Sequence, residues 1–277
     1  MLASGNINKM HTELLSEQVQ YHLPVGDQLL DINALIGRTI RIDYQQQINC
    51  QHCGRKTKKS FNQGYCYPCF SKLARCDSCI VSPEKCHFEQ GSCREPDWAE
   101  QNCFVDHYVY LANSSGLKVG ITRGSQIPTR WIDQGAIQAL PILKVSTRQL
   151  SGLCEVVFKQ YTADKTNWRK MLKNEVDILD MRAERDRLFE LAATDLQALE
   201  DQYGLQAISR ILDAEPTEIS FPVEQYPTKV VSFSLDKTPE LVGKLMGIKG
   251  QYLIFDNGVI NMRKYSGYQL NLSVLED

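Results

Sequence analysis

The chain lacks the segments that would direct it to a membrane or hold it there. Residues Met1 to Gln20 contain Asn, His, Glu and Gln where the apolar core of a signal peptide would be required. No apolar run approaches the roughly 20 residues of a membrane-spanning helix. We therefore expect a cytoplasmic protein without a membrane partner, in which cysteine thiols stay reduced.

The chain also has no glycine-rich phosphate loop, no low-complexity segment and no overall positive charge. Its 277 residues carry a net charge of −2, and 43% of them are hydrophobic. Charge is nevertheless uneven. Tyr44 to Arg75 holds six basic residues and no acidic one, whereas Asn174 to Tyr203 holds nine acidic and three basic residues. This asymmetry indicates an anionic partner at one end of the molecule only.

The cysteines are the most informative residues that are present. Nine of the ten lie between Cys50 and Cys103. Cys50-x2-Cys53 is followed, twelve residues later, by Cys66-x2-Cys69. Each pair fits a tight turn, and two such turns supply four thiolates to one tetrahedral ion. The spacing therefore predicts a zinc-ribbon-like site.

A second metal site is predicted from the cysteines that follow. Cys76-x2-Cys79 needs partners of its own, and Cys86 and Cys93 complete it most simply. Three further residues compete as ligands: Cys103, His87 and His107. Four thiolates suit zinc or an iron–sulfur cluster, and the irregular spacing does not choose between them. The alternative is a set of buried thiols that pack as small apolar groups.

A basic run lies between the first two cysteine pairs and consists of Arg55, Lys56, Lys58 and Lys59. Zinc ribbons commonly present basic surfaces to nucleic acid, so we expect this run to contact the phosphates of DNA or RNA. The alternative is a solvated loop that binds nothing.

The residues after the cysteines predict a unit of strands and helices. Two strands, Tyr108–Ala112 and Leu117–Thr122, flank the turn residues Asn113 to Gly116 and form a hairpin. The elements expected next are a helix over Pro128–Asp133, a strand over Ile142–Val145, a helix from about Thr147 to Thr162, and a long helix capped by Asp164 or Thr166.

This order of elements, with its residues, resembles the GIY-YIG nuclease superfamily. Tyr108-Val109-Tyr110 stands where the first motif lies, and Lys118-Val119-Gly120 stands where the second lies. Arg130, Glu155 and Asn167 follow in the family order. Two positions depart from the pattern: Tyr108 replaces a glycine, and Lys118 replaces a tyrosine, a change that occurs within the superfamily.

The resemblance implies a magnesium-dependent endonuclease. Tyr110 would position or deprotonate the attacking water, with Lys118 close by to favour the phenolate. Arg130 would clamp the phosphate. Glu155 would hold one Mg²⁺, and Asn167 would support the site through hydrogen bonds.

Most of residues 30–270 is also similar to a bacterial family known only as a domain of unknown function. The similarity is carried by the runs Gly91 to Pro96, Gly116 to Arg123 and Met246 to Tyr252. It brings no established activity with it.

The two ends of the chain predict β structure. Residues from Thr39 to Asn49 alternate and predict a strand that enters the first cysteine pair. Four more strands are expected near the C-terminus: Ile219–Val223, Lys229–Ser234, Tyr252–Phe255 and Val259–Met262. Leu241 to Met246 echoes Leu35 to Ile40, and we expect both runs to lie in one small β-barrel-like module.

We therefore expect an α+β fold. The expected parts are an N-terminal extension (1–33), a cysteine-rich metal-binding module (34–105), a GIY-YIG-like domain with a trailing long helix (106–205) and a small β-rich domain (206–277). The predicted function is that of a zinc-binding protein acting on nucleic acid, with a metal-dependent endonuclease activity. The alternatives are a non-catalytic module that binds nucleic acid, the ribosome or another protein, and a regulator that responds to zinc or redox state.

Overall fold

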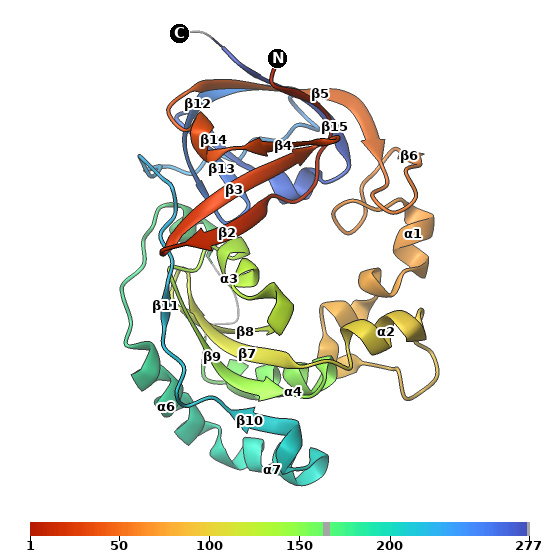
Figure 1. The fold of residues 1–277 in the computed structure, drawn as a ribbon, viewed down its shortest axis with the longest axis vertical. Coiled ribbons are helices and arrows are strands. Elements are labelled where there is room, and N and C mark those ends of the chain that lie inside the picture. The colour runs from red at the N-terminus through yellow and green to blue at the C-terminus, as the bar shows by residue number, and fades with distance from the viewer. Residues whose placement is uncertain (163–166, 276–277) are drawn as a thin grey trace.

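The computed structural model describes residues 1–162 and 167–275. Antiparallel sheets and separate helices make up the molecule, which confirms the α+β class. Figure 1 shows strands from both ends of the chain at the top, a second sheet with its helices below, and the cysteine-rich segment beside both. No helix in the described ranges is long and apolar enough to cross a membrane. The expected caps Asp164 and Thr166 lie outside those ranges.

The largest sheet joins the two ends of the chain. Its strands, in order, are β1 (Ala3–Asn6), β15 (Tyr268–Val274), β5 (Thr39–Asn49), β12 (Glu240–Lys249), β13 (Tyr252–Phe255) and β14 (Gly258–Asn261), with β6 (Lys56–Thr57) paired to β5. The two similar runs meet in this sheet, where Gly243 lies opposite Ile40 and Lys244 opposite Thr39. Among the described residues β1 does not pair with β14, so the expected β-barrel-like module is an open sheet.

Residues 1–33, expected as an extension, contain four strands of this β-rich unit. Beside β1 they form a second sheet from β2 (His11–Leu15), β3 (Gln18–Val25) and β4 (Gln28–Asp31). In β3 the alternate residues Val19, Tyr21, Leu23 and Val25 are fully buried. They belong to one apolar core with side chains of β5, β12 and β15. The N-terminal strands and the C-terminal strands therefore share one apolar core.

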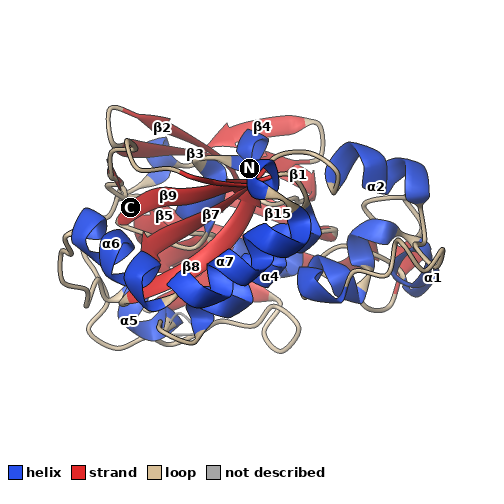
Figure 2. Ribbon diagram, turned by 90° about the horizontal axis from the view of Figure 1, so that it is seen from below, coloured by secondary structure: helices blue, strands red, loops and turns tan. Residues whose placement is uncertain are grey.

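The predicted α/β unit forms as expected, with element ends shifted by a few residues. Its sheet consists of β10 (Ile208–Arg210), β9 (Gln138–Val145), β7 (His107–Asn113) and β8 (Leu117–Arg123), with β11 (Thr217–Glu218) paired to β9. The short helix α3 (Thr129–Asp133) connects β8 to β9, and α4 (Arg148–Lys159) follows β9. Figure 2 shows α4 and α7 over one face of this sheet.

The expected long helix is wrong, because the chain forms three shorter ones. These are α5 (Trp168–Leu172), α6 (Met181–Leu191) and α7 (Ala193–Tyr203). Asn174 takes a left-handed φ of 58° just beyond α5, which ends that helix. Asp180 starts α6 by accepting the backbone N–H groups of Arg182 and Ala183.

Two of the expected C-terminal strands are also wrong. The run Ile219–Val223 makes only two isolated bridges, from Ser220 to Gln18 and from Val223 to Gly247. Pro222 has no N–H and interrupts a ladder there. The run Lys229–Ser234 makes one bridge, from Ser232 to Val259. The strands expected over Tyr252–Phe255 and Val259–Met262 are confirmed as β13 and β14.

The cysteine-rich module contains little regular structure. Its elements are β6, α1 (Tyr67–Lys72), α2 (Pro96–Asn102) and three single turns of 3₁₀ helix at Ala74–Cys76, Ser78–Ile80 and Pro83–Lys85. The turn at Pro83–Lys85 packs closely on α4. A Cβ added to Gly152 would lie 2.7 Å from the Glu84 nitrogen and 2.8 Å from the Pro83 Cβ. Glycine therefore lets α4 approach the module.

Candidate metal centre and basic cleft

The four cysteines of the predicted zinc ribbon come together. The sulfurs of Cys50, Cys53, Cys66 and Cys69 all lie within 4.8 Å of one another. The Cys53 and Cys66 sulfurs are 3.8 Å apart. A tetrahedral zinc ion with Zn–S bonds of about 2.3 Å requires sulfur separations of roughly 3.8 Å. The cluster therefore fits a four-thiolate zinc site, as the sequence predicts.

Local backbone geometry builds this cluster. Gly54, with a φ of +70°, closes the first turn by donating its N–H to the Cys50 carbonyl at 2.8 Å. The second pair lies at the start of α1, where Cys66 is the N-cap residue. Burial alone would raise the pKa of the Cys50 thiol, but backbone N–H groups of Cys53, Cys66 and His52 lower it to about 6. These donors favour the thiolate that zinc binds.

The predicted basic run lies on the surface of the metal module. The side chains of Arg55, Lys56, Lys58 and Lys59 are exposed in the segment between the two cysteine pairs. The Lys59 ammonium lies 5.2 Å from the centre of the Phe61 ring. Phe61 in turn packs on Tyr67 and Phe70, with ring centres 5.5 and 5.6 Å away. The run therefore stands next to an aromatic cluster.

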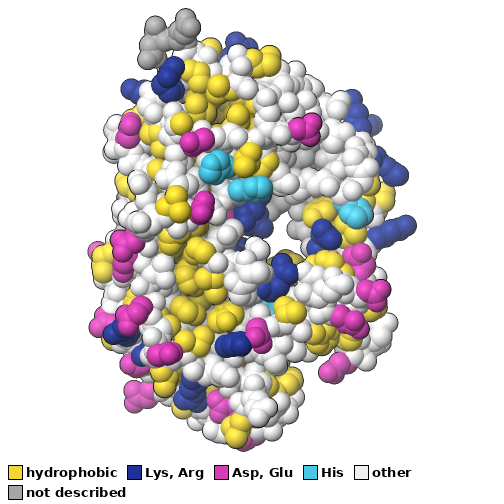
Figure 3. Space-filling view, in the orientation of Figure 1, with side chains coloured by type: hydrophobic (Ala, Val, Ile, Leu, Met, Phe, Trp, Pro, Cys, Tyr) yellow, Lys and Arg dark blue, Asp and Glu magenta, His cyan; other side chains and the backbone are white. Residues whose placement is uncertain are grey.

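A cleft of about 720 Å³ separates the metal module from the other two parts of the molecule. Figure 3 shows the molecule hollowed there, with Lys and Arg side chains at the edge. The basic residues that line the cleft are Lys9, Arg75, Arg123, Arg130, Arg148, Lys159 and Arg263. The carboxylates among its described lining residues are Asp133 and Glu155. The cleft therefore carries a net positive charge.

Both carboxylates of the cleft have cationic partners. The Asp133 carboxylate is 2.5 Å from the Lys9 ammonium and 4.0 Å from the Arg263 guanidinium. Glu155 lies 3.3 Å from the Lys159 ammonium, one helical turn away on α4. Burial raises the pKa of the Glu155 carboxyl, whereas Lys159 and Arg130 oppose this shift.

Four of the five residues that resemble nuclease landmarks lie close enough to influence one another's charge, and two of them line this cleft. Arg130 and Glu155 line it directly. Burial lowers the pKa of the Lys118 ammonium to about 8, helped by Arg130 and opposed by Glu155. Burial raises the pKa of the Tyr110 phenol to about 12, against the effect of Arg130 and Gln134. Within the described ranges the Tyr110 hydroxyl makes no hydrogen bond of good geometry.

The fifth landmark, Asn167, lies outside the cleft. Its side chain caps α5 by accepting the backbone N–H groups of Arg169 and Lys170 at 3.2 Å each. Its own backbone N–H donates to the Ser115 hydroxyl at 2.9 Å. Asn167 therefore has a structural role at the turn of the β7–β8 hairpin.

The other predicted metal ligands are only partly gathered. Cys79, Cys86, Cys93 and Cys103 line one small void of about 20 Å³, whereas Cys76 does not. A second close group contains Asp77, Cys79 and His87, with ligand atoms within 4.8 Å of one another. His107 is buried, and its Nδ1 lies 2.7 Å from the Val105 carbonyl.

Several residues of the cleft are not predicted from the sequence. Lys9, Arg75 and Arg263 come from three separate parts of the chain; Arg75 ends the basic stretch that begins at Tyr44, Arg263 has Lys264 beside it, and Lys9 has no charged residue next to it. Arg148 begins α4 and donates to the Ile80 carbonyl of the metal module at 2.6 Å. A basic run is visible in a sequence, whereas a cleft assembled from single residues is visible only after folding.

Residues 37–270 match the family model described as "Protein of unknown function (DUF2797)". The match spans most of the chain, so the protein belongs to this family, which agrees with the similarity noted over residues 30–270. No curated protein and no solved structure matches the chain significantly. The resemblance to GIY-YIG nucleases has no support from these comparisons and stays a prediction.

Proposed function

We propose that this protein binds nucleic acid in the basic cleft and cleaves a phosphodiester there with the help of a divalent metal ion. The composition of the cleft carries this proposal, since seven basic side chains surround a hollow with two carboxylates among its described lining residues. Pockets for small molecules are mostly apolar. A chain of phosphates, in contrast, needs repeated cationic contacts.

Arg130 and Glu155 are suited to the two sides of a bound phosphodiester. The guanidinium of Arg130 matches a phosphate through two parallel hydrogen bonds. Glu155 is the carboxylate of the cleft that would hold Mg²⁺, which neutralises phosphate charge when bound. Because the Lys159 ammonium lies 3.3 Å from Glu155, it competes with the ion. We therefore expect weak metal binding without substrate.

The pKa values favour Lys118 as the group that accepts the proton of the attacking water. A general base works best when its pKa is near the working pH. The pKa of Lys118 is about 8, whereas that of Tyr110 is about 12. Tyr110 therefore stays protonated, and its hydroxyl, near Arg130 and Gln134, is suited to orient the water. This assignment keeps Tyr110 in the positioning role that the family resemblance allows and gives the deprotonation of the water to Lys118.

The order of strands and helices also supports the proposed nuclease function. The antiparallel strands β8, β7 and β9 lie side by side, α3 connects β8 to β9, and α4 follows. This is the strand and helix order in which the sequence resembles GIY-YIG nucleases. Asn167 lies outside the cleft and is left out of the proposed site.

Cleavage is tested with labelled single- and double-stranded DNA and RNA in the presence of Mg²⁺. Glu155→Gln should abolish cleavage and leave binding intact or slightly tighter, because the carboxylate that would hold Mg²⁺ is lost while every basic side chain of the cleft stays. Lys118→Met should lose rate by at least about 100-fold, the usual contribution of a general base. The matched control is Glu190→Gln, at an exposed position on α6. Cleavage that persists unchanged in Glu155→Gln contradicts the catalytic proposal.

Binding is tested separately, by fluorescence anisotropy over a range of salt concentrations. Arg75→Gln with Arg130→Gln should weaken binding and flatten the salt dependence by about 0.9 per lost phosphate contact on duplex DNA. The triple change of Lys56, Lys58 and Lys59 to Gln tests the basic run on the metal module instead. Lys237→Gln, at an exposed position outside the cleft, is the control. If neither set of changes affects affinity, the protein does not bind nucleic acid through these surfaces.

A second candidate function is binding without cleavage. The Glu155–Lys159 ion pair and the position of Asn167 favour it, because the first occupies the metal ligand and the second removes a landmark. Salt-dependent binding by the unchanged protein, with no cleavage of any of the four substrates in Mg²⁺ or Mn²⁺, decides for this candidate.

A further inference from the structure

The segment from Leu73 to Cys103 has no apolar core to hold it. The three hydrophobic cores of the described residues contain no residue between Asn49 and His107. The segment consists of three single 3₁₀ turns and the seven-residue helix α2. Segments this small usually need disulfides or metal ions to stay folded. All cysteines in the chain are free.

Four of these cysteines line the same small space, although within the described ranges no three of their sulfurs lie within 4.8 Å of one another. Cys79, Cys86 and Cys103 line two adjoining voids of about 30 and 20 Å³, and Cys93 completes the lining of the smaller one. The rings of Phe88 and Phe104, with centres 4.6 Å apart, border both voids and pack edge to face. Such an apolar cover excludes water from metal thiolates.

We propose that Cys79, Cys86, Cys93 and Cys103 bind a second structural zinc ion, and that Cys76 is not a ligand. Zinc is favoured because its closed structural sites take four thiolates in tetrahedral geometry. The proposal changes one ligand of the set expected from spacing, with Cys103 in place of Cys76. It is independent of any activity in the cleft.

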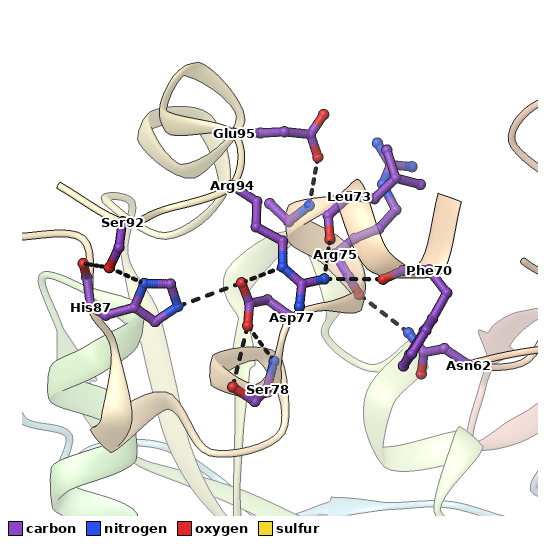
Figure 4. A network of polar contacts seen from close by, with 11 residues as sticks. Asn62, Phe70, Leu73, Arg75, Asp77, Ser78, His87, Ser92, Arg94 and Glu95 are labelled. Atoms are coloured by element: carbon purple, nitrogen blue, oxygen red, sulfur yellow. Dashed lines mark hydrogen bonds and ion pairs between the residues drawn. The ribbon is translucent and has the colours of Figure 1, made fainter. Parts of the chain in front are cut away.

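The competing group of Asp77, Cys79 and His87 is explained by a polar network instead. Figure 4 shows Asp77 between Arg94 and His87. One Asp77 oxygen accepts the Ser78 N–H at 2.6 Å, and the other lies 2.8 Å from the Arg94 guanidinium and 3.5 Å from the His87 ring. With the second His87 nitrogen 2.8 Å from the Ser92 hydroxyl, both residues already have partners.

The same network connects the second cysteine group to the zinc ribbon. Arg94 also donates to the Phe70 and Leu73 carbonyls at 3.0 and 3.4 Å, at the end of α1. The Glu95 carboxylate accepts the Ala74 N–H at 2.6 Å. Asp77 and Arg94 therefore connect the two cysteine groups. The Asp77 carboxylate is engaged in this connection and is not needed as a metal ligand.

Metal analysis of the full-length protein tests the assignment. Four thiolates per ion predict about two zinc ions per chain. Cys103→Ser and Cys93→Ser should each lose one ion, as should Cys53→Ser at the first site. Cys76→Ser and His87→Ala should keep both. One zinc ion in the unchanged protein, or loss of an ion in Cys76→Ser with retention in Cys103→Ser, overturns the proposal.

A measurement on the unchanged protein covers the case in which a variant does not fold. After replacement of zinc by Co²⁺, two four-thiolate sites should give about twice the thiolate charge-transfer absorption per chain of one site. Absorption expected for one such site, or iron in the purified protein, overturns the second zinc site.

Discussion

The β-rich unit and the cysteine-rich module are stabilised by different means. The β-rich unit buries complete apolar side chains from both ends of the chain, including Tyr21, Leu23, Ile248 and Tyr265. The cysteine-rich segment from Cys50 to Cys103 contributes no residue to the described hydrophobic cores, and thiols occupy much of its interior. One part therefore depends on side-chain packing, whereas the other contains a four-cysteine cluster that fits zinc. The basic cleft lies between the cysteine-rich segment and the two other parts of the molecule.

Removal of zinc should have the largest effect on stability. It should unfold the cysteine-rich segment and leave the β-rich unit folded. Structural zinc ions contribute about 10 kcal/mol or more to small domains that fold around them. A strong chelator should expose the amides of residues 50–103 to hydrogen exchange while β3 and β12 remain protected. Mass spectrometry of the exchanged peptides measures this. Uniform loss of protection in both parts would mean that the molecule is a single cooperative unit.

Leu23→Ala should have the next largest effect on stability, and this effect should be confined to the β-rich unit. Leu23 is fully buried, and such truncations usually cost about 2–5 kcal/mol. The free energy of unfolding of the β-rich unit should fall by that amount, with no change in zinc content. Leu29→Ala, where the side chain is 55% exposed, is the control and should change little. Loss of zinc in Leu23→Ala would contradict the idea that the two parts are stabilised independently.

Gly152→Ala tests the contact between the cysteine-rich module and helix α4 of the α/β unit. The added methyl group would overlap the Glu84 backbone and the Pro83 ring, and overpacking of this kind costs about 1–3 kcal/mol. Because α4 also carries Glu155, nucleic-acid affinity or cleavage should change together with stability. Val156→Ala, exposed on the same helix, is the control. Equal stability of the two variants would show that the contact between α4 and the Pro83–Lys85 turn can adjust to an added methyl group at little cost.

The smallest expected effect is the pH dependence due to Lys249. Burial lowers the pKa of this lysine to about 8 from 10.5, so the unfolded chain keeps its proton to higher pH. Between about pH 8 and pH 10 the folded protein has lost the Lys249 proton that the unfolded chain still holds. The free energy of unfolding therefore rises with pH in this range. Denaturant titrations should find this rise, on the order of 1 kcal/mol, reduced in Lys249→Met. Lys237→Met, at an exposed position, should leave the rise unchanged.

Features encoded by short spacing are the ones that the sequence predicts well. The cluster of Cys50, Cys53, Cys66 and Cys69 and the β7–β8 hairpin both depend on residues within about twenty positions of each other. The break before α6 had a local signal in Asp180, a good N-cap residue. That signal was outweighed by the apolar residues that continue on both sides.

Features that depend on distant partners are not predicted. The alternation of Val19, Tyr21 and Leu23 is visible in the sequence, but their packing partners lie at the other end of the chain. The cleft draws its basic residues from four parts of the chain: Lys9, Arg75, the stretch from Arg123 to Lys159, and Arg263. Of these residues only Arg130 belongs to the predicted landmarks. The second cysteine group is ambiguous because its spacing is irregular, and only the enclosed void separates Cys103 from Cys76.

The central position of β5 has a consequence for the synthesis of the chain. Its two long partners, β12 and β15, come about 200 residues later, so most of β5 leaves the ribosome unpaired, and only its last residues can pair early, with β6. The cysteine pairs that follow β5 emerge soon after it and can take up zinc while the later strands are still being translated. One end of β5 is then fixed by the metal before its neighbours exist. Because an unpaired strand edge can pair with another chain, early anchoring of β5 would protect the nascent chain until its last strands are made.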